Sequence, residues 1–253
     1  MAAETLYASD ELAAIGLSTG SLPRHVAFIM DGNGRWAVAR GMSRIDGHRE
    51  GAKTAQMVIE ESARLGLAQV TLFCLSSENW KRPADELEML LALLEEYLIS
   101  EREQVVRRNL QFAMIGRRAG LPDGVLRELD ATVEAARGNT GTRLCLAIYY
   151  GSRGEIADAA RRIAEEIAAG RRNPDSIDEA AVAASLDTAG MPDPDLVIRT
   201  AGEMRLSNFL LWQLSYAELH VSPKCWPEFS RDDYFAALRD YTVRDRRYGG
   251  LKG

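Results

Sequence analysis

The chain has 253 residues, of which 46% are hydrophobic, enough for one sizeable α/β core. Its formal net charge of -6 argues against nucleic acid as the main partner, because surfaces that bind nucleic acid are basic. The three cysteines (Cys74, Cys145 and Cys225) lack metal-type spacing, and the N-terminal residues show neither a basic nor an apolar signal region, so we expect a reduced, cytoplasmic protein. No run of about 18 apolar residues occurs, so we expect no transmembrane segment, which leaves peripheral membrane contact open.

Six short apolar runs predict strands, and longer amphipathic segments between them predict helices. The runs cover residues 26–30, 70–75, 111–116, 144–150, 196–200 and, most weakly, 219–222. Helical patterns include residues 85–98 and 153–170, and the second ends in Gly170, a residue suited to a helix C-terminus. Apolar strands that alternate with helices are typical of a parallel sheet covered on both faces. We therefore expect one α/β domain over residues 1–253, with a mostly parallel six-stranded sheet flanked by helices and an N-terminal extension over residues 1–22.

Polar segments rich in glycine or serine follow four of the predicted strands. They read DGNGRW after the first, SSENWKRP after the second, YGSRGE after the fourth and RTAGEMRLS after the fifth. In a parallel sheet these segments all emerge at the carboxyl edge, where open α/β sheets bind their ligands. The sequence therefore predicts a ligand site at this edge.

The first of these segments resembles a nucleotide-binding loop only in part. Residues 32–37 match the pattern G-x-G-x-x-A, but that pattern also needs an acidic residue about 20 positions later, at the end of the second strand. Here the second strand ends in Ser76-Ser77-Glu78, which is too late, and no G-x-x-x-x-G-K-[ST] occurs. A nucleotide site is therefore not favoured, and a plain tight turn remains the alternative for the two glycines.

Arginines gather in or beside the strand-end segments although the chain is acidic overall; they are Arg35, Arg44, Arg82, Arg199 and Arg205. Guanidinium groups match phosphate oxygens, and this number suits two diphosphates better than one monophosphate. Neutral hydroxyl donors are added by Ser76, Ser77 and Ser207. The alternative is that each arginine is an ordinary solvated surface charge.

Asp31 stands directly before the glycine loop, where its charge would repel a phosphate. Mg²⁺ characteristically takes one or two carboxylates together with substrate phosphates, so a cation between Asp31 and a diphosphate removes the conflict. We therefore expect Asp31 to be a magnesium ligand, and departure of diphosphate to be the chemistry. Glu218 is a second candidate ligand, and an exposed helix-end carboxylate is the alternative for it.

Several long motifs occur in one order from about His25 to Gly250: HVAFIMDGNGRWA, GHREGA, LSSENWKRP, YYGSR, DLVIRTAGEMRLSNFLLWQLSYAEL, WPEF and RDRRYGG. In these motifs the chain resembles the cis-prenyltransferases, the family of undecaprenyl diphosphate synthase. The resemblance implies a homodimeric α/β enzyme that depends on Mg²⁺. It also implies condensation of an allylic prenyl diphosphate with isopentenyl or dimethylallyl diphosphate.

The resemblance also implies roles for individual residues. Asp31 becomes the essential metal carboxylate, with Glu218 as the second. The allylic diphosphate is assigned to Gly32, Asn33, Gly34, Arg35, Arg44 and His48, and the second diphosphate to Arg199, Arg205 and Ser207. Trp36 and Leu206 are also expected to bind substrate. Asn79 with Ser76 is the proposed proton relay, in a loop completed by Ser77, Glu78, Trp80 and Arg82. The helix around residues 87–98, whose apolar pattern alone favours core packing, is expected from the resemblance to line a tunnel for the growing prenyl chain.

Some positions depart from the family pattern: Cys74, Leu75, Tyr149, Ser152, Ala201 and Met204. A bulky Tyr149 in the tunnel would shorten the space for the chain, since packed interiors yield little room. We therefore expect a short or irregular, branched product. The alternatives are a housekeeping undecaprenyl diphosphate synthase and a non-catalytic subunit. The non-catalytic subunit is disfavoured because Asp31, Asn79, Arg199 and Arg205 are all present.

Overall fold

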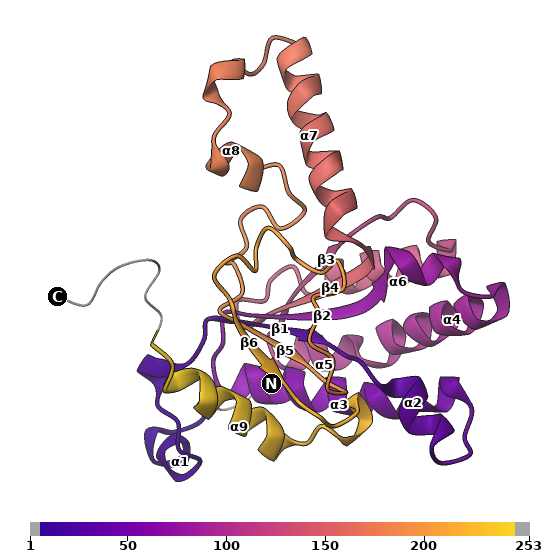
Figure 1. Ribbon diagram of the computed structural model, residues 1–253, viewed down its shortest axis with the longest axis vertical. Coiled ribbons are helices and arrows are strands. Elements are labelled where there is room, and N and C mark those ends of the chain that lie inside the picture. Colours follow the sequence, from indigo (N-terminus) through magenta and orange to yellow (C-terminus); the bar gives the residue numbers. More distant parts are fainter. Residues whose placement is uncertain (1–5, 246–253) are drawn as a thin grey trace.

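The computed structural model describes residues 6–245, so the motif RDRRYGG lies outside the described residues from position 246 onward. A six-stranded sheet in the order β3-β4-β2-β1-β5-β6 forms its centre, and all neighbouring strands are parallel (Figure 1). The strands are β1 (His25–Ile29), β2 (Gln69–Ser76), β3 (Gln111–Ile115), β4 (Arg143–Tyr150), β5 (Leu196–Arg199) and β6 (Glu218–Val221). The helices are α1 (Ser9–Ala14), α2 (Asn33–Val38), α3 (Arg44–Arg64), α4 (Ala84–Ser100), α5 (Arg102–Arg107), α6 (Asp123–Ala135), α7 (Ser152–Ala168), α8 (Glu179–Ala183) and α9 (Arg231–Thr242). The predicted α/β fold is confirmed, with each strand at an expected apolar run.

The two faces of the sheet are covered by different kinds of structure. Val26 and Phe28 point into the larger core cluster, which also contains side chains of α3, α4, α6 and α9. The intervening Ala27 joins a smaller cluster with Phe209 and its neighbours from the segment 200–217. Both faces are therefore covered, as expected, but one by long helices and the other largely by a loop segment.

Strands β2 and β4 change register as they approach the carboxyl edge. Phe73 pairs with Ala147, Leu75 with Ile148 and Ser76 with Tyr150. Cys74 is therefore an extra residue in β2, and Tyr149 is an extra residue in β4 with a left-handed φ of 49°. Bulges of this kind redirect side chains beside functional sites. As a result Tyr149 packs on the helical face of the sheet, whereas Tyr150 packs on the other.

Residues 6–22 pack onto the helices rather than extending away from them. Tyr7 Oη donates a hydrogen bond to Glu61 Oε2 at 2.6 Å, and Arg239 Nη1 donates to the carbonyl of Ile15 at 2.9 Å. Leu12 and Leu17 are buried in the larger core cluster. The segment before β1 thus contributes to the same core as the rest of the fold.

Helices α7 and α8 project away from the sheet (Figure 1). The first turn of α7 is held at its base by Glu155, which is buried and accepts hydrogen bonds from Tyr150 Oη at 2.5 Å and from Gln213 Nε2 at 3.2 Å. The projection is thereby tied to the segment that follows β5. Between residues 6 and 245, none of the helices combines the length and apolar character needed to cross a membrane.

Candidate active site

Asp31 follows β1, and its backbone is fixed from several directions. Its carbonyl oxygen accepts hydrogen bonds from Thr200 Oγ1 at 2.7 Å and from the N–H of Trp226 at 2.9 Å. Gly32 turns the chain with a φ of 101°, and a Cβ atom there would lie 2.9 Å from atoms of Cys225. This backbone conformation and this spacing admit only glycine, so the turn after Asp31 is fixed. The Asp31 carboxylate lines a cavity.

Three arginines surround the Asp31 carboxylate. Arg199, which is 2% exposed, donates to Asp31 Oδ2 at 2.8 Å and to Ser207 Oγ at 2.8 Å. Arg35 Nη2 lies 3.3 Å from Asp31 Oδ1, and Arg205 Nη2 lies 3.9 Å from Asp31 Oδ2. Burial disfavours the charged carboxylate, but the hydrogen bond and charge of Arg199 and the charge of Arg35 hold the pKa of Asp31 below its usual value. Asp31 is therefore ionised at neutral pH.

This cluster carries more positive than negative charge. Glu203 is its second anion, bound to Arg35 Nη1 at 3.0 Å and to Arg205. Three guanidinium groups thus face two carboxylates. The Nε of Arg199 is buried and has no hydrogen-bond partner among the described residues. Buried donors are nearly always paired, so the cluster has capacity for a further anionic acceptor.

The other two predicted arginines form a second group around Glu86. Arg82 Nη1 lies 2.8 Å from Glu86 Oε1, and Arg44 Nε lies 3.6 Å from the same oxygen. The Arg44 guanidinium covers Gly34, where an added Cβ would lie 2.9 Å from Arg44 Cζ. Burial and the charges of Arg82 and Arg44 lower the pKa of His48 to about 4, so this side chain is neutral at pH 7. The five arginines therefore meet at the carboxyl edge as two neighbouring groups.

The loop after β2 presents amide and carboxylate groups beside these cations. Asn79 Oδ1 accepts a hydrogen bond from the Ser76 N–H at 2.9 Å, which leaves the Asn79 amide as a donor. Glu78 Oε1 accepts from Asn208 Nδ2 at 2.9 Å and so links this loop to the segment after β5. An amide in this arrangement can orient an oxygen ligand but is not a base.

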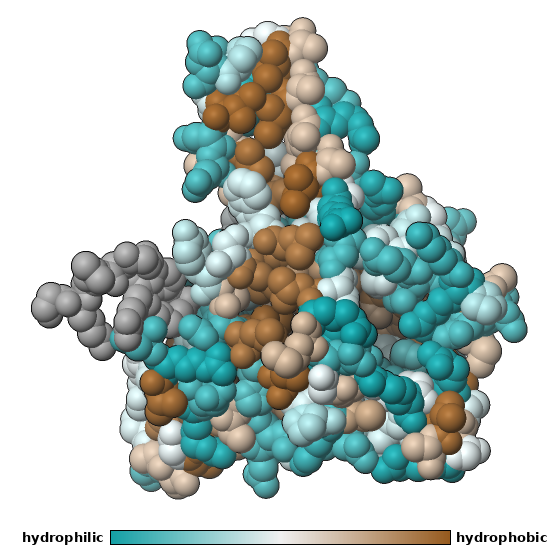
Figure 2. Space-filling view, in the orientation of Figure 1, coloured by the Kyte–Doolittle hydropathy of each residue, from teal (hydrophilic) through white to brown (hydrophobic). Residues whose placement is uncertain are grey.

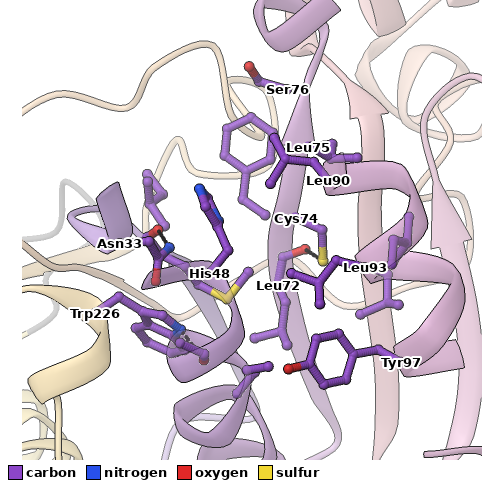
Figure 3. A pocket seen from close by; sticks show the side chains of 18 of the residues that line it. Asn33, His48, Leu72, Cys74, Leu75, Ser76, Leu90, Leu93, Tyr97 and Trp226 are labelled. Carbon is purple, nitrogen blue, oxygen red and sulfur yellow. Dashed lines mark hydrogen bonds between the residues drawn. The ribbon is translucent and has the colours of Figure 1, made fainter. Parts of the chain in front are cut away.

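A cavity of about 730 Å³ adjoins the polar groups and continues between the sheet and helices α3 and α4. Its polar end contains Asp31, Asn33, His48, Ser76, Glu78, Asn79, Arg82, Arg199, Arg205 and Ser207, and its apolar walls include Leu72, Cys74, Leu90, Leu93, Leu94, Leu98, Val105 and Phe112. Figure 3 shows Asn33 and His48 on one side, Leu90 and Leu93 on the opposite side, and Leu72 and Cys74 between them. Cations at one end of an apolar cavity fit a ligand with an anionic head and a hydrocarbon tail.

Eight predicted substrate residues are not among those that line this cavity; they are Gly32, Gly34, Arg35, Trp36, Arg44, Ser77, Trp80 and Leu206. The Trp80 ring stacks on Tyr149 with 3.6 Å between centroids, and the Trp36 ring lies under the Arg40 guanidinium at 4.5 Å. Leu206 packs against the smaller core cluster, and Ser77 Oγ donates to Glu78 at 3.2 Å. These side chains support the loops that carry the lining residues.

The structure corrects the role expected for Tyr149. Because the bulge turns its ring onto Trp80, Tyr149 is not among the residues that line the cavity and does not narrow it. Met204 is 80% exposed and also lies away from the lining. Of the departures from the family pattern, Cys74 and Leu75 are the ones that line the cavity.

The structure does not bring Glu218 and Asp31 together within one chain. Glu218 begins β6 opposite Leu196, at the amino end of β5, whereas Asp31 follows the carboxyl end of β1. Glu218 and Val221 are three strand positions apart, roughly 10 Å at about 3.3 Å per residue, with Val221 level with Arg199. Glu218 instead binds Arg244 Nη1 at 2.7 Å. Within residues 6–245, no group of three His, Cys, Asp or Glu side chains is placed to hold a metal ion.

Several site residues were not predicted from the sequence. Glu203 and Glu86 act as counter-ions, Asn208 joins two loops, and Trp226 lines the cavity with its Nε1 donating to the Gly51 carbonyl at 2.7 Å. The spacing of Arg82 and Glu86, four apart at the start of a helix, was a usable signal for an ion pair. The other three required knowledge of which loops meet in space.

Comparisons with known proteins agree with this architecture. The family model described as putative undecaprenyl diphosphate synthase matches residues 29–249. An isoprenyl transferase of Rhodopirellula baltica is 52% identical over 240 residues, covering 95% of this chain and 98% of the relative. Another from Geobacter sulfurreducens is 49% identical, covering 92% and 95%.

Solved structures share the fold. Lavandulyl diphosphate synthase from Lavandula x intermedia, in complex with dimethylallyl diphosphate, has a TM-score of 0.89 and 37% identity, covering 91% of this chain and 99% of that chain. A probable undecaprenyl diphosphate synthase from Campylobacter jejuni has a TM-score of 0.74 and 31% identity, covering 90% and 98%. With motifs, fold and relatives in agreement over most of its length, this chain belongs to the undecaprenyl diphosphate synthase family and is a prenyl diphosphate synthase of the cis-prenyltransferase type.

Proposed function

We propose that this protein condenses an allylic prenyl diphosphate with isopentenyl diphosphate in a Mg²⁺-dependent reaction. The allylic C–O bond breaks, a C–C bond forms to the isopentenyl double bond, and diphosphate and one proton leave. The observation that carries the proposal is the junction of the Asp31–Arg199 cluster with an apolar cavity of about 730 Å³. A diphosphate head and a prenyl tail match these two parts in chemistry.

Asp31 fits a magnesium site of the kind that substrate completes. It supplies one ionised carboxylate at the cavity wall, and the neighbouring arginines can hold the phosphate oxygens that Mg²⁺ uses as its other ligands. When bound, Mg²⁺ would neutralise charge on the departing diphosphate. Glu218 cannot join Asp31 from within the same chain, so its role as a ligand remains a proposal that requires another arrangement of the protein.

We assign the two diphosphates to different sets of arginines. Arg44, Arg82 and the neutral His48 suit the allylic diphosphate together with Arg35, and Arg199 and Arg205 suit isopentenyl diphosphate together with Ser207. Asp31 lies 3.3 Å from Arg35 and 2.8 Å from Arg199, so the two anions would bind on either side of one carboxylate. The Asn79 amide would orient a diphosphate oxygen, and that oxygen would accept the proton because an amide is a poor base.

For the product, the cavity favours repeated addition to a linear chain. Lining residues follow α4 from Leu90 to Leu98 and continue to Val105, and the eight helical steps from Leu90 to Leu98 alone span ~12 Å at about 1.5 Å per residue. The short or irregular product predicted from Tyr149 loses that support, because Tyr149 lies off the cavity. It remains the second candidate, since the similar lavandulyl diphosphate synthase was solved with dimethylallyl diphosphate bound.

Product analysis tests these alternatives. The protein is incubated with Mg²⁺, isopentenyl or dimethylallyl diphosphate, and each short allylic diphosphate, and products are identified by mass spectrometry and NMR. Linear chains that grow with isopentenyl diphosphate support the first candidate. A branched short product from dimethylallyl diphosphate alone supports the second, and no prenyl product from any pair would contradict the proposal.

The homodimer implied by the family resemblance is supported by exposed apolar surface. Figure 2 shows a hydrophobic band from the α7–α8 projection to the middle of the molecule. In the segment after β5, Leu211 is 36% exposed and Tyr216 is 71% exposed, while Ile177, just before α8, is 41% exposed. We place the dimer contact on this face, because large apolar patches mark interaction sites. The cytoplasmic location expected from the sequence stays a prediction.

A further inference from the structure

The far end of the main cavity meets a second, smaller cavity of about 230 Å³. Some side chains line both and therefore form the wall between them; they are Gln56, Ile59, Glu101, Val105 and Leu144. Val105 and Leu144 are buried at 4% and 5% exposure, so they form a fixed part of that wall.

Two members of the wall are polar and bind each other. Gln56 Nε2, from α3, donates to Glu101 Oε1, at the junction of α4 and α5, with 2.6 Å between the atoms. Tyr97, one turn earlier on α4, also contacts α3, because its Oη donates to the Arg49 carbonyl at 3.1 Å. The helices that enclose the apolar cavity are thus bridged at its side by Tyr97 and at its end by the Gln56–Glu101 pair.

A prenyl chain cannot replace this hydrogen bond. Its carbon atoms gain by burial against Leu93, Leu94 and Leu98, but it has no donor or acceptor for Gln56 or Glu101. A chain that passed the pair would separate it and leave a carboxylate against hydrocarbon, which is strongly unfavourable. The space beyond is also unsuited to hydrocarbon, because it is lined by Arg107 and by the Glu60–Arg108 ion pair at 2.9 Å.

We propose that the Gln56–Glu101 hydrogen bond is the stop that sets maximum product length. This inference rests on the proposed function, because it requires that a prenyl chain grows in the main cavity. Elongation is favourable while each added C5 unit meets apolar walls, and it ends when the next unit would have to open the pair. The pair therefore determines specificity without touching the reacting atoms.

Product chain lengths test the proposal. Wild type, Gln56→Ala and Glu101→Ala are supplied with Mg²⁺, farnesyl diphosphate and excess isopentenyl diphosphate, and the products are sized by mass spectrometry. Both variants should give a dominant product at least one C5 unit longer than wild type, with an unchanged initial rate of diphosphate release. The double variant should lengthen the product no more than the more effective single variant, because both substitutions remove one interaction.

Two controls make the result specific. Glu101→Gln keeps the side-chain volume and can keep the hydrogen bond, so it should retain the wild-type product. Gln104→Ala alters the second cavity but not the shared wall, and it should also leave product length unchanged. Wild-type lengths from both alanine variants at normal initial rates would overturn the inference. Absence of any product from wild type would instead refute the proposed function.

Discussion

Arg199 is the residue on which the proposed anion site depends. It is 2% exposed, it binds Asp31 and Ser207, and its Nε has no partner among the described residues. A buried guanidinium needs both charge compensation and acceptors for its N–H groups. Asp31 supplies one negative charge and one acceptor, and a substrate diphosphate would supply further negative charge and further acceptors. Arg205, by contrast, has a 59% exposed side chain and can adjust to whichever anion is present.

Arg205→Ala is expected to weaken binding of isopentenyl diphosphate while leaving the fold intact. The loss of one charge-assisted contact costs roughly 1.5–3 kcal/mol, which should appear in the KM for that substrate. Arg118→Ala is the matched control, because it removes an exposed arginine that pairs with Asp130 and does not line the cavity. Steady-state kinetics that place the defect in the allylic substrate alone would reverse the assignment of the two sites.

We expect His25 to make the stability of the fold depend on pH. Burial lowers its pKa to about 4, with Nδ1 close to the Pro192 carbonyl at 2.8 Å and Nε2 close to Thr71 Oγ1 at 2.7 Å. Between pH 6.5 and about 4 the unfolded chain binds a proton that the folded chain does not, so stability is complete above 6.5 and falls as pH drops towards 4. The difference between these pKa values corresponds to about 3 kcal/mol.

The measurement is urea unfolding at several pH values for wild type and His25→Gln. The variant should lose less stability between pH 6.5 and pH 4.5, and the slopes should agree above pH 7. His48, with a pKa also near 4, contributes to both proteins and cancels in the comparison. Equal slopes over the acidic range would show that His25 does not remain neutral in the folded state.

Individual residues also show what the sequence could and could not predict. Asp31, Arg35 and Arg199 were found because parallel strands place their carboxyl ends at one edge, so loops far apart in sequence were expected to meet. Tyr149 lies on the same face of the sheet as the cavity, but its ring stacks on Trp80 instead of lining the cavity, and nothing in the apolar run of β4 marks this contact or the bulge beside it. The sequence could not show which end of β6 Glu218 occupies, and its role as a metal ligand stays a prediction.

At the scale of elements, the strand runs and the long helices followed directly from apolar periodicity. What periodicity could not predict was the path of the segment after β5, which has few apolar repeats and several left-handed residues. Ala201 has a φ of 68°, and Ser207 and Asn208 have φ values of 50° and 60°. This backbone costs a non-glycine residue about 1–2 kcal/mol, and here tertiary contacts impose it: the Ala201 N–H donates to the Lys224 carbonyl.

Ala201→Gly should therefore stabilise the protein by about 1 kcal/mol. Glycine takes this conformation without the strain caused by a Cβ atom, and the strain removed is larger than the cost of glycine's greater entropy in the unfolded chain. Chemical denaturation measures the change. Ala164→Gly, at an exposed position inside α7, is the control and should lower stability by about 1 kcal/mol. A destabilised Ala201→Gly protein would mean that the Ala201 methyl makes contacts worth more than the strain.

In the whole molecule, the two faces of the sheet have different roles, because long helices cover one face and a loop segment covers the other. The helical face encloses the apolar cavity between α3, α4 and the sheet, while the carboxyl edge carries the cations. The opposite face bears the segment after β5, whose Leu211 and Tyr216 are exposed. A surface of this kind is suited to a second copy of the chain, as the family resemblance implied.

Leu211→Arg is expected to shift the protein from dimer to monomer, since a charge buried in an apolar contact without a partner is unfavourable. Analytical ultracentrifugation over a concentration series measures the change. Val133→Arg, which alters a 43% exposed position on α6, is the control and should leave association unchanged. If wild type is monomeric at all concentrations, or if only Val133→Arg dissociates it, the proposed contact is wrong.

The most direct test of the account is the activity of Asp31→Asn beside wild type, with and without Mg²⁺. Asparagine keeps an acceptor for Arg199 but removes the charge needed for the metal, so turnover should fall by roughly 100-fold or more, and removing Mg²⁺ with a chelator should abolish wild-type turnover. Circular dichroism checks that the variant is folded, and Asp130→Asn on the exposed face of α6 serves as the control. A folded Asp31→Asn protein that retains most of its turnover would contradict the account.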